Sequence, residues 1–177
     1  MLVGLGLGPG NPEFLTLRAV RLLKEADEVF VPGRIAHDLV APYREPVMLE
    51  FPMTDDETRI QQCLEENAKK IAPVAENGLA VFGILGDPNF FSTFSRLCSV
   101  IATTHPGIEY RTEPGISSIT AFAAAAQVPV NAGFTVSDGT VSDTQILLKV
   151  RRPKERAGQL RAEGYREFIL VERMFFP

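Results

Sequence analysis

Apolar residues in this chain form short continuous runs that alternate with stretches in which they recur at helical spacing. Runs rich in Val, Leu, Ile and Phe occupy residues 2–7, 28–31 and 79–85, and each is followed by Gly or Pro, as is typical of buried strands. Over residues 13–26 and 57–77 the apolar positions return every three or four residues, which predicts helices. This order of strands and helices predicts an α/β fold.

The alternation continues through the rest of the chain. Thr54 and Glu57 predict a capping box at the start of the long helix. The turn at Glu113 is the best domain boundary and divides the chain into an N-terminal lobe of residues 1–112 and a C-terminal lobe of residues 113–177. The other predicted elements are a helix with Phe94, Leu97 and Ile101, a strand over 108–111, a helix over 117–127, strands over 146–150 and 168–172, and a helix near 155–163.

The composition is that of a globular protein. The 177 residues suffice for one domain or for two small lobes, and 45% of them are hydrophobic and 23% charged. These fractions exclude a disordered or collagen-like chain. The formal net charge of −4 argues against a nucleic-acid partner, because binding to phosphates needs a basic footprint, although a local basic patch is compatible with this sum.

The sequence gives no sign of a membrane span or a metal site. Its longest apolar stretch, near AFAAAAQVPV, is shorter than the roughly 20 residues that span a bilayer. Cys63 and Cys98 form no CxxC pair, and His37 and His105 are too sparse to suggest metal ligands. We therefore expect a cytoplasmic protein with reduced thiols, no metal and no membrane partner.

Three glycine-proline turns are the strongest functional signal. GLGLGPGNP, GDPNFFSTF and EPGISSITA each follow a predicted buried strand and each precede a helix. Ligands of open α/β sheets bind beyond the carboxyl ends of the strands, where backbone groups and helix N-termini meet. One such turn could be an ordinary connection, and Asp87, Ser117 and Ser118 could simply start helices. Three turns together favour a binding site.

The first turn does not match a nucleotide-binding motif. Glycines stand at every second position from Gly4 to Gly10, so the third glycine of GxGxxG would fall on Pro9 or Asn11. The next strand, EVFVP, ends in proline where a dinucleotide site has an acidic residue, and no GxxxxGK[ST] motif occurs. A nicotinamide dehydrogenase is therefore the least favoured enzyme class.

The three turns resemble the signature motifs of the tetrapyrrole methylase family, which uses S-adenosylmethionine to methylate porphyrin-derived macrocycles. The resemblance covers about residues 2–150 and includes GLGLGPGNPEFLTLRAVRLLKEAD, VFGILGDPNFFSTF and EPGISSITA. Within the family, FVPG, FPM, GDPNFFSTF and the LLKV strand are most similar to the carbon-20 methyltransferase of cobalamin synthesis, which acts on precorrin-2 or cobalt-factor II.

The resemblance implies two α/β lobes with the methyl donor in the cleft between them, and a homodimer. The chain is abbreviated between Phe134 and Gln145 relative to the family and stops at Pro177, so we expect a shortened second lobe. Carried over by motif, the S-adenosylmethionine contacts would be Pro9, Gly10, Gly86, Asp87, Phe90, Ser117, Ser118 and Leu148.

A tetrapyrrole substrate carries many carboxylates and would need cations to bind them. The candidates are Arg34, His37, Arg44, Arg151 and Arg152, each of which could equally belong to a solvated surface. Methyl transfer to an electron-rich carbon depends mainly on alignment in a dry cleft, and the sequence does not identify the base that removes the displaced proton.

Several alternatives remain open at this point. The same fold could methylate another precorrin carbon, a modified protein side chain or ribosomal RNA, although the net charge disfavours RNA. A non-catalytic relative that binds a tetrapyrrole without methylating it is a further candidate.

Overall fold

The structure of the protein is a computed structural model that describes residues 1–136, 144–147 and 150–170. Contacts between residues divide the chain into two compact units, Met1–Ala132 and Gly133–Pro177, which are described separately. The strand β5, the turn after Glu113 and the helix α5 all lie in the first unit. The lobe boundary expected at Glu113 stays a prediction.

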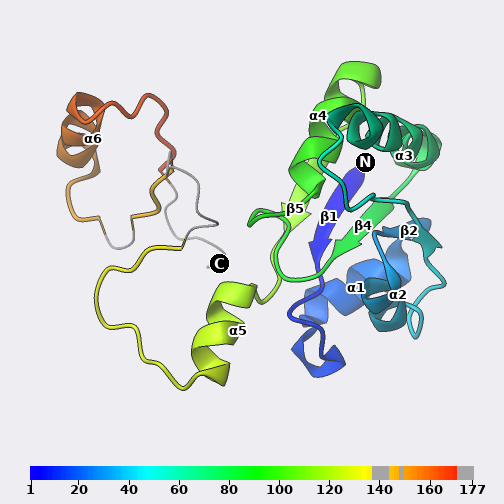
Figure 1. Cartoon of the computed structure of the whole chain (residues 1–177), viewed down its shortest axis with the longest axis horizontal. Helices are drawn as coiled ribbons and strands as arrows, with labels where there is room; N and C mark the ends of the chain where they lie inside the picture. The colour runs from blue at the N-terminus through cyan, green and yellow to red at the C-terminus, as the bar shows by residue number, and fades with distance from the viewer. Residues whose placement is uncertain (137–143, 148–149, 171–177) are drawn as a thin grey trace. The chain divides into compact units, whose positions relative to one another are not determined.

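The first unit contains a five-stranded sheet in which each paired strand is parallel to its neighbours, in the order β3-β2-β4-β1-β5. Figure 1 labels β2, β4, β1 and β5 in this order. The carboxyl ends of all five strands therefore lie at one edge of the sheet, which we call the carboxyl edge. The strands are β1 (Leu2–Gly6), β2 (Glu28–Val31), β3 (Val47–Met48), β4 (Ala80–Ile84) and β5 (Tyr110–Glu113).

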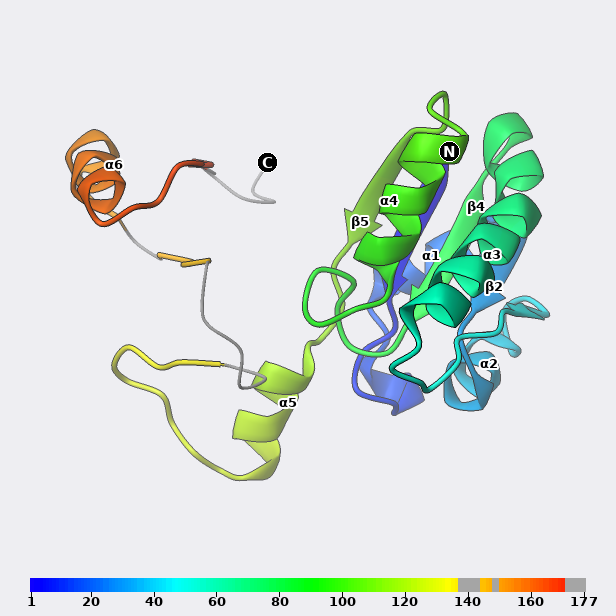
Figure 2. The ribbon, with the colours of Figure 1, turned by 45° about the horizontal axis from the view of Figure 1, so that its top comes forward.

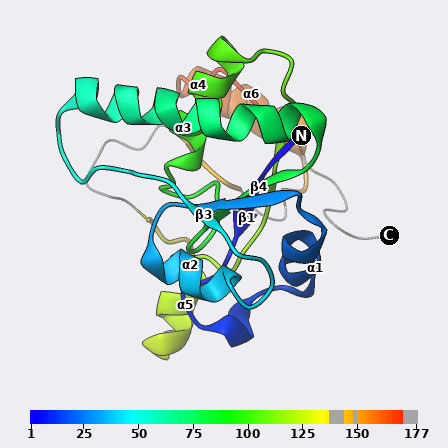
Figure 3. The same ribbon diagram turned by 90° about the vertical axis from the view of Figure 1, so that its right-hand side faces the viewer.

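Helices cover both faces of this sheet. Side chains alternate along β1, so that Leu2 packs in the cluster under α3 (Glu57–Asn77) and α4 (Phe94–Thr104), while Val3 and Leu5 pack on the opposite face. That opposite face is covered by α1 (Leu17–Glu25) and α2 (Arg34–Val40). Figure 3 shows α1 and α2 on one side of the strands and α3 and α4 on the other, and Figure 2 shows α3 and α4 side by side.

One helix starts at a residue other than the one predicted, and another has a different N-cap. α1 begins at Leu17 and not at Glu13, because the Thr16 hydroxyl accepts a hydrogen bond from the Ala19 amide at 3.0 Å. α3 begins at Glu57 as expected, but its cap is Asp56, whose carboxylate accepts from the amides of the next turn. The capping box with Thr54 was wrong, since the Thr54 hydroxyl bonds to the Asp56 amide instead.

The remaining elements are short. The helix α5 (Ser118–Ala125) ends two residues earlier than predicted, and α2 was not predicted at all. The second unit contains α6 (Pro153–Ala162), with Leu160 as a buried residue of that helix. The strands predicted over 146–150 and 168–172 are not formed in the described residues of those ranges, whose side chains are exposed. Residues 148, 149, 171 and 172 lie outside the described part.

Candidate functional site

The topology places a switch point between β1 and β4. These strands are neighbours, yet the helix that follows β1 packs on one face of the sheet and the helix that follows β4 packs on the other (Figure 3). At such a point the two connections diverge and leave a crevice at the carboxyl edge, which is where open α/β sheets bind ligands. The first two glycine-proline turns start from these two strands.

Backbone hydrogen bonds join the first turn to the second. The Gly86 amide donates to the Gly8 carbonyl at 2.7 Å, and the Gly8 amide donates to the Gly86 carbonyl at 3.2 Å. This pair of bonds is an antiparallel bridge beyond the ends of two parallel strands. The two turns therefore form one continuous backbone surface.

The third turn packs directly against the other two. A Cβ atom added to Gly115 would lie 2.7 Å from the Cα of Gly6, and one added to Gly6 would lie 2.8 Å from the carbonyl oxygen of Gly86. Any side chain at Gly6 or Gly115 would therefore separate the strand ends. The three motif turns, which the sequence could only set side by side as a hypothesis, meet at one place in the structure.

Asp87 holds the second and third turns together. Its side chain is buried at 7% exposure, and one carboxylate oxygen accepts from the Gly115 amide at 3.1 Å. The other oxygen accepts from the backbone and side-chain nitrogens of Asn89 at 2.9 and 3.1 Å. Asp87 does not start the next helix, which begins at Phe94. Its role in the structure is to organise the turns.

The backbone at Gly10 and Gly86 is not covered by other atoms of the described chain. Nothing lies within 4 Å of a Cβ added to Gly10, and the nearest atom to one added to Gly86 is the Ser118 amide nitrogen at 3.8 Å. Both glycines have positive φ angles, +119° and +74°. A ligand could therefore approach the main chain here closely, and Pro9, between Gly8 and Gly10, is exposed beside it.

Three more of the predicted donor contacts lie in the second and third turns. Ser117 caps α5 by accepting from the Thr120 amide at 3.4 Å, and Ser118 is the exposed first residue of that helix. Phe90 lies in the loop after Asp87 and is 41% exposed. Pro9, Gly10, Gly86, Asp87, Phe90, Ser117 and Ser118 thus belong to the joined turns, whereas Leu148 lies outside the described residues.

An ion-pair cluster that the sequence did not reveal lies beside the third turn. Glu113 ends β5 with 5% exposure, and both of its carboxylate oxygens accept from the Arg18 guanidinium, at 2.5 and 2.6 Å. Arg111 also pairs with Glu113. Glu113 stood in the sequence only as part of a turn, although an acidic residue at the end of a buried strand is a signal for a cationic partner.

Two of the predicted substrate cations lie near the carboxyl edge. Arg34 begins the helix after β2 and pairs with Asp38 at 2.9 Å. His37 contacts Asp38 at 3.2 Å and Glu45 at 3.4 Å. The His37 hydrogen bond, with the nearby Arg34 charge, holds the pKa of the Asp38 carboxyl below its usual value. Arg34 and Asp38 are exposed to solvent, where a carboxylate ligand could displace their pairing.

Arg44 lies at the opposite edge of the sheet. Its guanidinium donates to the carbonyl oxygens of Leu23, Lys24 and Asp27, at 3.2–3.4 Å, around the C-terminal end of α1. A helix that connects parallel strands runs back to the amino edge, so this group is distant from the three turns. The structure separates Arg44 from the predicted site and gives it a capping role.

The last two predicted cations belong to the second unit. Arg151 and Arg152 are exposed, and Arg152 pairs with Glu155 at 3.1 Å. Their part in substrate binding stays a prediction.

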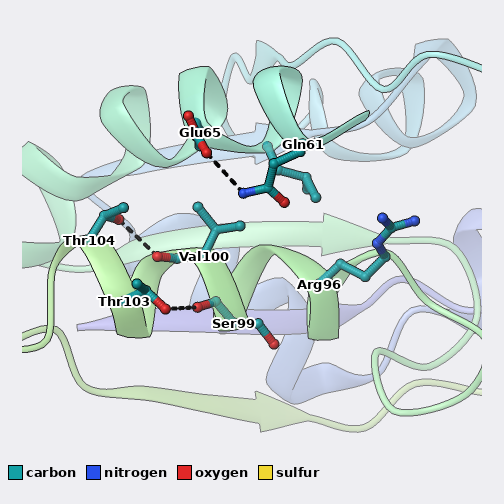
Figure 4. Close-up of a pocket in the computed structure, with 8 residues that line it drawn as sticks. Gln61, Glu65, Arg96, Ser99, Val100, Thr103 and Thr104 are labelled. Carbon is teal, nitrogen blue, oxygen red and sulfur yellow. Dashed lines mark hydrogen bonds between the residues drawn. The ribbon is translucent and has the colours of Figure 1, made fainter. Parts of the chain in front are cut away.

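A separate groove of about 350 Å³ lies between α3 and α4 (Figure 4). Gln61 and Glu65 face Ser99, Thr103 and Thr104 across it. Its polar groups are already paired: the Gln61 amide donates to Glu65 at 2.9 Å, and the hydroxyls on α4 donate to carbonyls of their own helix. None of the predicted site residues lines this groove.

Both cysteines lie on helices outside the three turns, Cys63 in α3 and Cys98 in α4. Burial raises the pKa of the Cys98 thiol to about 12, which makes it a poor nucleophile near neutral pH. Among the residues that the structure describes, no three His, Cys, Asp or Glu side chains are grouped as a metal site would require. None of the described helices is long and apolar enough to cross a membrane.

Comparison with known proteins identifies the family. The model of the tetrapyrrole (corrin/porphyrin) methylases matches residues 1–170. The chain belongs to this family. The resemblance inferred from the three turns is therefore confirmed, and so is the α/β fold with a parallel sheet.

Curated relatives agree with the narrower resemblance. The chain is 34% identical, over 139 residues, to the probable cobalt-precorrin-2 C(20)-methyltransferase of Methanocaldococcus jannaschii, a match that covers 73% of this chain and 59% of that protein. The chain thus spans little more than half the length of this relative. The precorrin-2 C(20)-methyltransferase of a Sinorhizobium species is 27% identical over 97% of this chain and 83% of its own length.

Solved structures share the fold. The methyltransferase CobJ is 27% identical with a TM-score of 0.56, and the match covers 92% of this chain and 64% of CobJ. The uroporphyrin-III C-methyltransferase of Thermus thermophilus, solved in complex with S-adenosylhomocysteine, is 25% identical with a TM-score of 0.50, over 69% of this chain and 51% of that one.

Proposed function

We propose that this tetrapyrrole methylase transfers a methyl group from S-adenosylmethionine to carbon 20 of precorrin-2 or cobalt-factor II in cobalamin biosynthesis. The observation that carries the proposal is the joining of the three motif turns at the switch point between β1 and β4, with open backbone at Gly10 and Gly86. The family supports a methyl donor and a tetrapyrrole acceptor.

The choice of carbon 20 rests on relatives of this chain. Proteins from Methanocaldococcus jannaschii, a Sinorhizobium species and Salmonella typhimurium that match it are named as carbon-20 methyltransferases of precorrin-2 or cobalt-precorrin-2. Two short motifs favour the same subfamily: FVPG, which includes the last two residues of β2, and FPM, which precedes α3.

The residues of the site would act by binding and alignment. The donor would supply an electrophilic methyl group, whose bond to sulfur breaks as its bond to the macrocycle carbon forms, and that carbon would then lose its proton to water. Main-chain groups at Gly10 and Gly86 would position that donor, and the amide of Ser118 at the α5 N-terminus would add a hydrogen-bond donor. The charge on sulfur disappears in the reaction, so the step needs a fixed geometry in a dry site rather than a charged catalyst.

The decisive experiment follows a labelled methyl group from the donor to the product. The full chain is incubated with methyl-labelled S-adenosylmethionine and either precorrin-2 or cobalt-factor II, and the product is analysed by mass spectrometry and NMR. We expect a tetrapyrrole one methyl group heavier, labelled at carbon 20. A label on another carbon would identify a different precorrin methylase. Binding of both ligands without label transfer would favour the non-catalytic alternative.

The proposal includes a homodimer, the assembly that the family resemblance implies. Sedimentation of the full chain at several concentrations should give the mass of two chains. A single-chain mass at every concentration would contradict this part of the proposal and leave the methyl-transfer assay unaffected.

A further inference from the structure

The Arg18–Glu113 ion pair connects two of the three turns from outside the opening. Arg18 lies in the first turn of α1, the helix that follows the GLGLGPGNP segment. Glu113 is the last residue of β5 and directly precedes the Pro114–Gly115 turn. The two residues are 95 positions apart in the chain, so the pair is a long-range connection between the first and third turns.

Arg18 and Glu113 form a bidentate ion pair, which we call the clamp. The Nε and Nη2 atoms of Arg18 donate to separate oxygens of the carboxylate, at 2.5 and 2.6 Å. Two parallel bonds between planar groups fix orientation as well as distance. Arg111 neutralises the same carboxylate from within β5. Glu113 is thereby held in one orientation at the point where β5 passes into the turn.

The position of that turn decides the shape of the candidate donor site. Gly115, two residues after Glu113, packs against Gly6 and the Gly86 carbonyl and donates its amide to Asp87. The Ser118 amide, three residues further, lies next to Gly86. A small displacement of Glu113 would therefore move the α5 N-terminus relative to the other two turns. Asp87 fixes the turn from the β4 side, and Arg18 fixes it from the α1 side.

We propose that Arg18 and Glu113 are positioning residues that set the affinity of this site for its methyl donor. The inference rests on the proposed function, because it assumes that the donor binds at the joined turns. Neither side chain has to touch the donor. Their effect is to keep the main-chain groups of the third turn at the distance from Gly86 that binding requires, so that little binding energy is lost in ordering the turn.

The test measures binding of S-adenosylhomocysteine to the full chain by calorimetry. Glu113→Gln removes one charge of the pair at constant side-chain length, and Arg18→Gln removes the other charge and shortens the side chain. We expect each to raise the Kd about tenfold, which corresponds to about 1.4 kcal/mol. Arg18→Lys keeps the charge and loses the two parallel bonds, so its Kd should be intermediate.

Arg96→Gln is a matched control. Arg96 pairs with Glu57 at 2.5 Å, and its side chain is 47% exposed, against 48% for Arg18. This pair joins α4 to α3 and takes no part in the turns. Glu57 is 75% exposed and Glu113 only 6%, so the control should lose less thermal stability than Arg18→Gln, and its Kd should stay within about twofold of that of the parent chain.

A kinetic measurement separates positioning from general destabilisation. With a turnover assay for methyl transfer, Arg18→Gln should raise the KM for S-adenosylmethionine and leave kcat at saturating donor nearly unchanged. If the Glu113 variant fails to fold, Arg18→Lys and Arg18→Gln decide the question, since Arg18 is half exposed.

Two outcomes would overturn the inference in distinguishable ways. A Kd for both Arg18 variants equal to that of the parent chain, with only Tm lowered, would show that the clamp is purely structural, and the proposed function would stand. No binding of S-adenosylhomocysteine by the parent chain would refute the donor site itself, and the inference would fall with it.

Discussion

The residues at the carboxyl edge of the sheet occupy two different environments. In the inner group, Gly6 and Gly115 fill the space between strand ends, and Asp87 ties the turns together. In the outer group, a Cβ added to Gly10 or Gly86 would meet open space, and Phe90, in the loop that follows Gly86 and Asp87, is partly exposed. The same motifs supply both groups. Membership in a motif therefore does not say whether a residue holds the site together or faces its ligand.

Substitutions in the two groups should therefore have different effects on stability and on affinity. A change in the inner group should reduce the stability of the fold and lower affinity only as a consequence. A change in the outer group should lower affinity with a smaller loss of stability. Measuring the free energy of unfolding and the Kd for S-adenosylhomocysteine on the same variants tests the division.

Gly115→Val should cause the largest loss of stability. Its Cβ would lie 2.7 Å from the Cα of Gly6, and even closer to the Gly86 carbonyl oxygen, so the ends of β1 and β5 would have to separate. We expect the free energy of unfolding in urea to fall by about 3 kcal/mol. Gly107→Val is the control, because nothing lies within 4 Å of a Cβ at that glycine. Equal losses in the two variants would contradict the inner packing.

Asp87→Asn should have the second largest effect. The carboxylate accepts from the Gly115 amide and twice from Asn89, and an amide side chain would turn an NH2 group towards one of these donors. A buried donor left without a partner costs about 2 kcal/mol in the free energy of unfolding. Asp56→Asn is the control, since Asp56 is an exposed helix cap and Asn caps equally well. A loss of unfolding free energy no larger than that of the control would show that the Asp87 carboxylate does not stabilise the contact between the second and third turns.

The sequence located the residues of the outer group, but not the packing contacts of the inner one. Apolar runs followed by Gly and Pro locate the ends of β1 and β4, and the motif then points to Gly10 and Gly86. The contact of Gly6 with Gly115 forms because β5 is the neighbour of β1 in the sheet. The periodicity of apolar residues along the chain does not specify the order of the strands. The Arg18–Glu113 pair was missed for the same reason, because its partners are remote in the chain.

Short-range competition explains the other differences. Thr54 and Asp56 are both possible N-caps of α3. The Asp56 carboxylate accepts hydrogen bonds from two backbone amides, whereas the Thr54 hydroxyl accepts from one. The seven residues of α2 are too few for a clear period. Beyond residue 145, apolar runs predicted strands. A strand needs a partner to bond with, and the described residues of those runs, such as 146, 147 and 168–170, have exposed side chains outside any strand.

Gly86→Ala should weaken donor binding while costing the fold little stability. At φ = +74° an L-residue costs about 1 kcal/mol, so the fold should tolerate the change. The added methyl group would point into the open space beside the Ser118 amide, where we expect the donor, and should raise the Kd about tenfold. Gly164→Ala, at φ = +106° with nothing within 4 Å, is the control, because it adds backbone strain in the second unit and the three turns belong to the first. A parallel rise in Kd for this control would mean that strain alone weakens binding.

Phe90→Ala should have the smallest effect on stability and is the strictest test of the outer group. The ring is 41% exposed, so little packing is lost on its removal, and we expect less than about 0.5 kcal/mol in the free energy of unfolding. If the ring borders the donor, the lost contact should raise the Kd for S-adenosylhomocysteine about fivefold, within the range for aromatic contacts.

Tyr110→Ala is the matched control for Phe90→Ala. Tyr110 is an aromatic residue of similar exposure, 50%, but it begins β5 and therefore lies at the amino edge of the sheet, away from the turns. Its removal should leave the Kd unchanged, because no donor contact is expected there. An unchanged Kd for Phe90→Ala as well would place that ring outside the donor site and restrict the outer group to the two glycines. Since Gly10 and Gly86 carry no side chain to select a ligand, specificity for the donor would then have to come from other side chains, such as those of Ser117 and Ser118 at the start of α5.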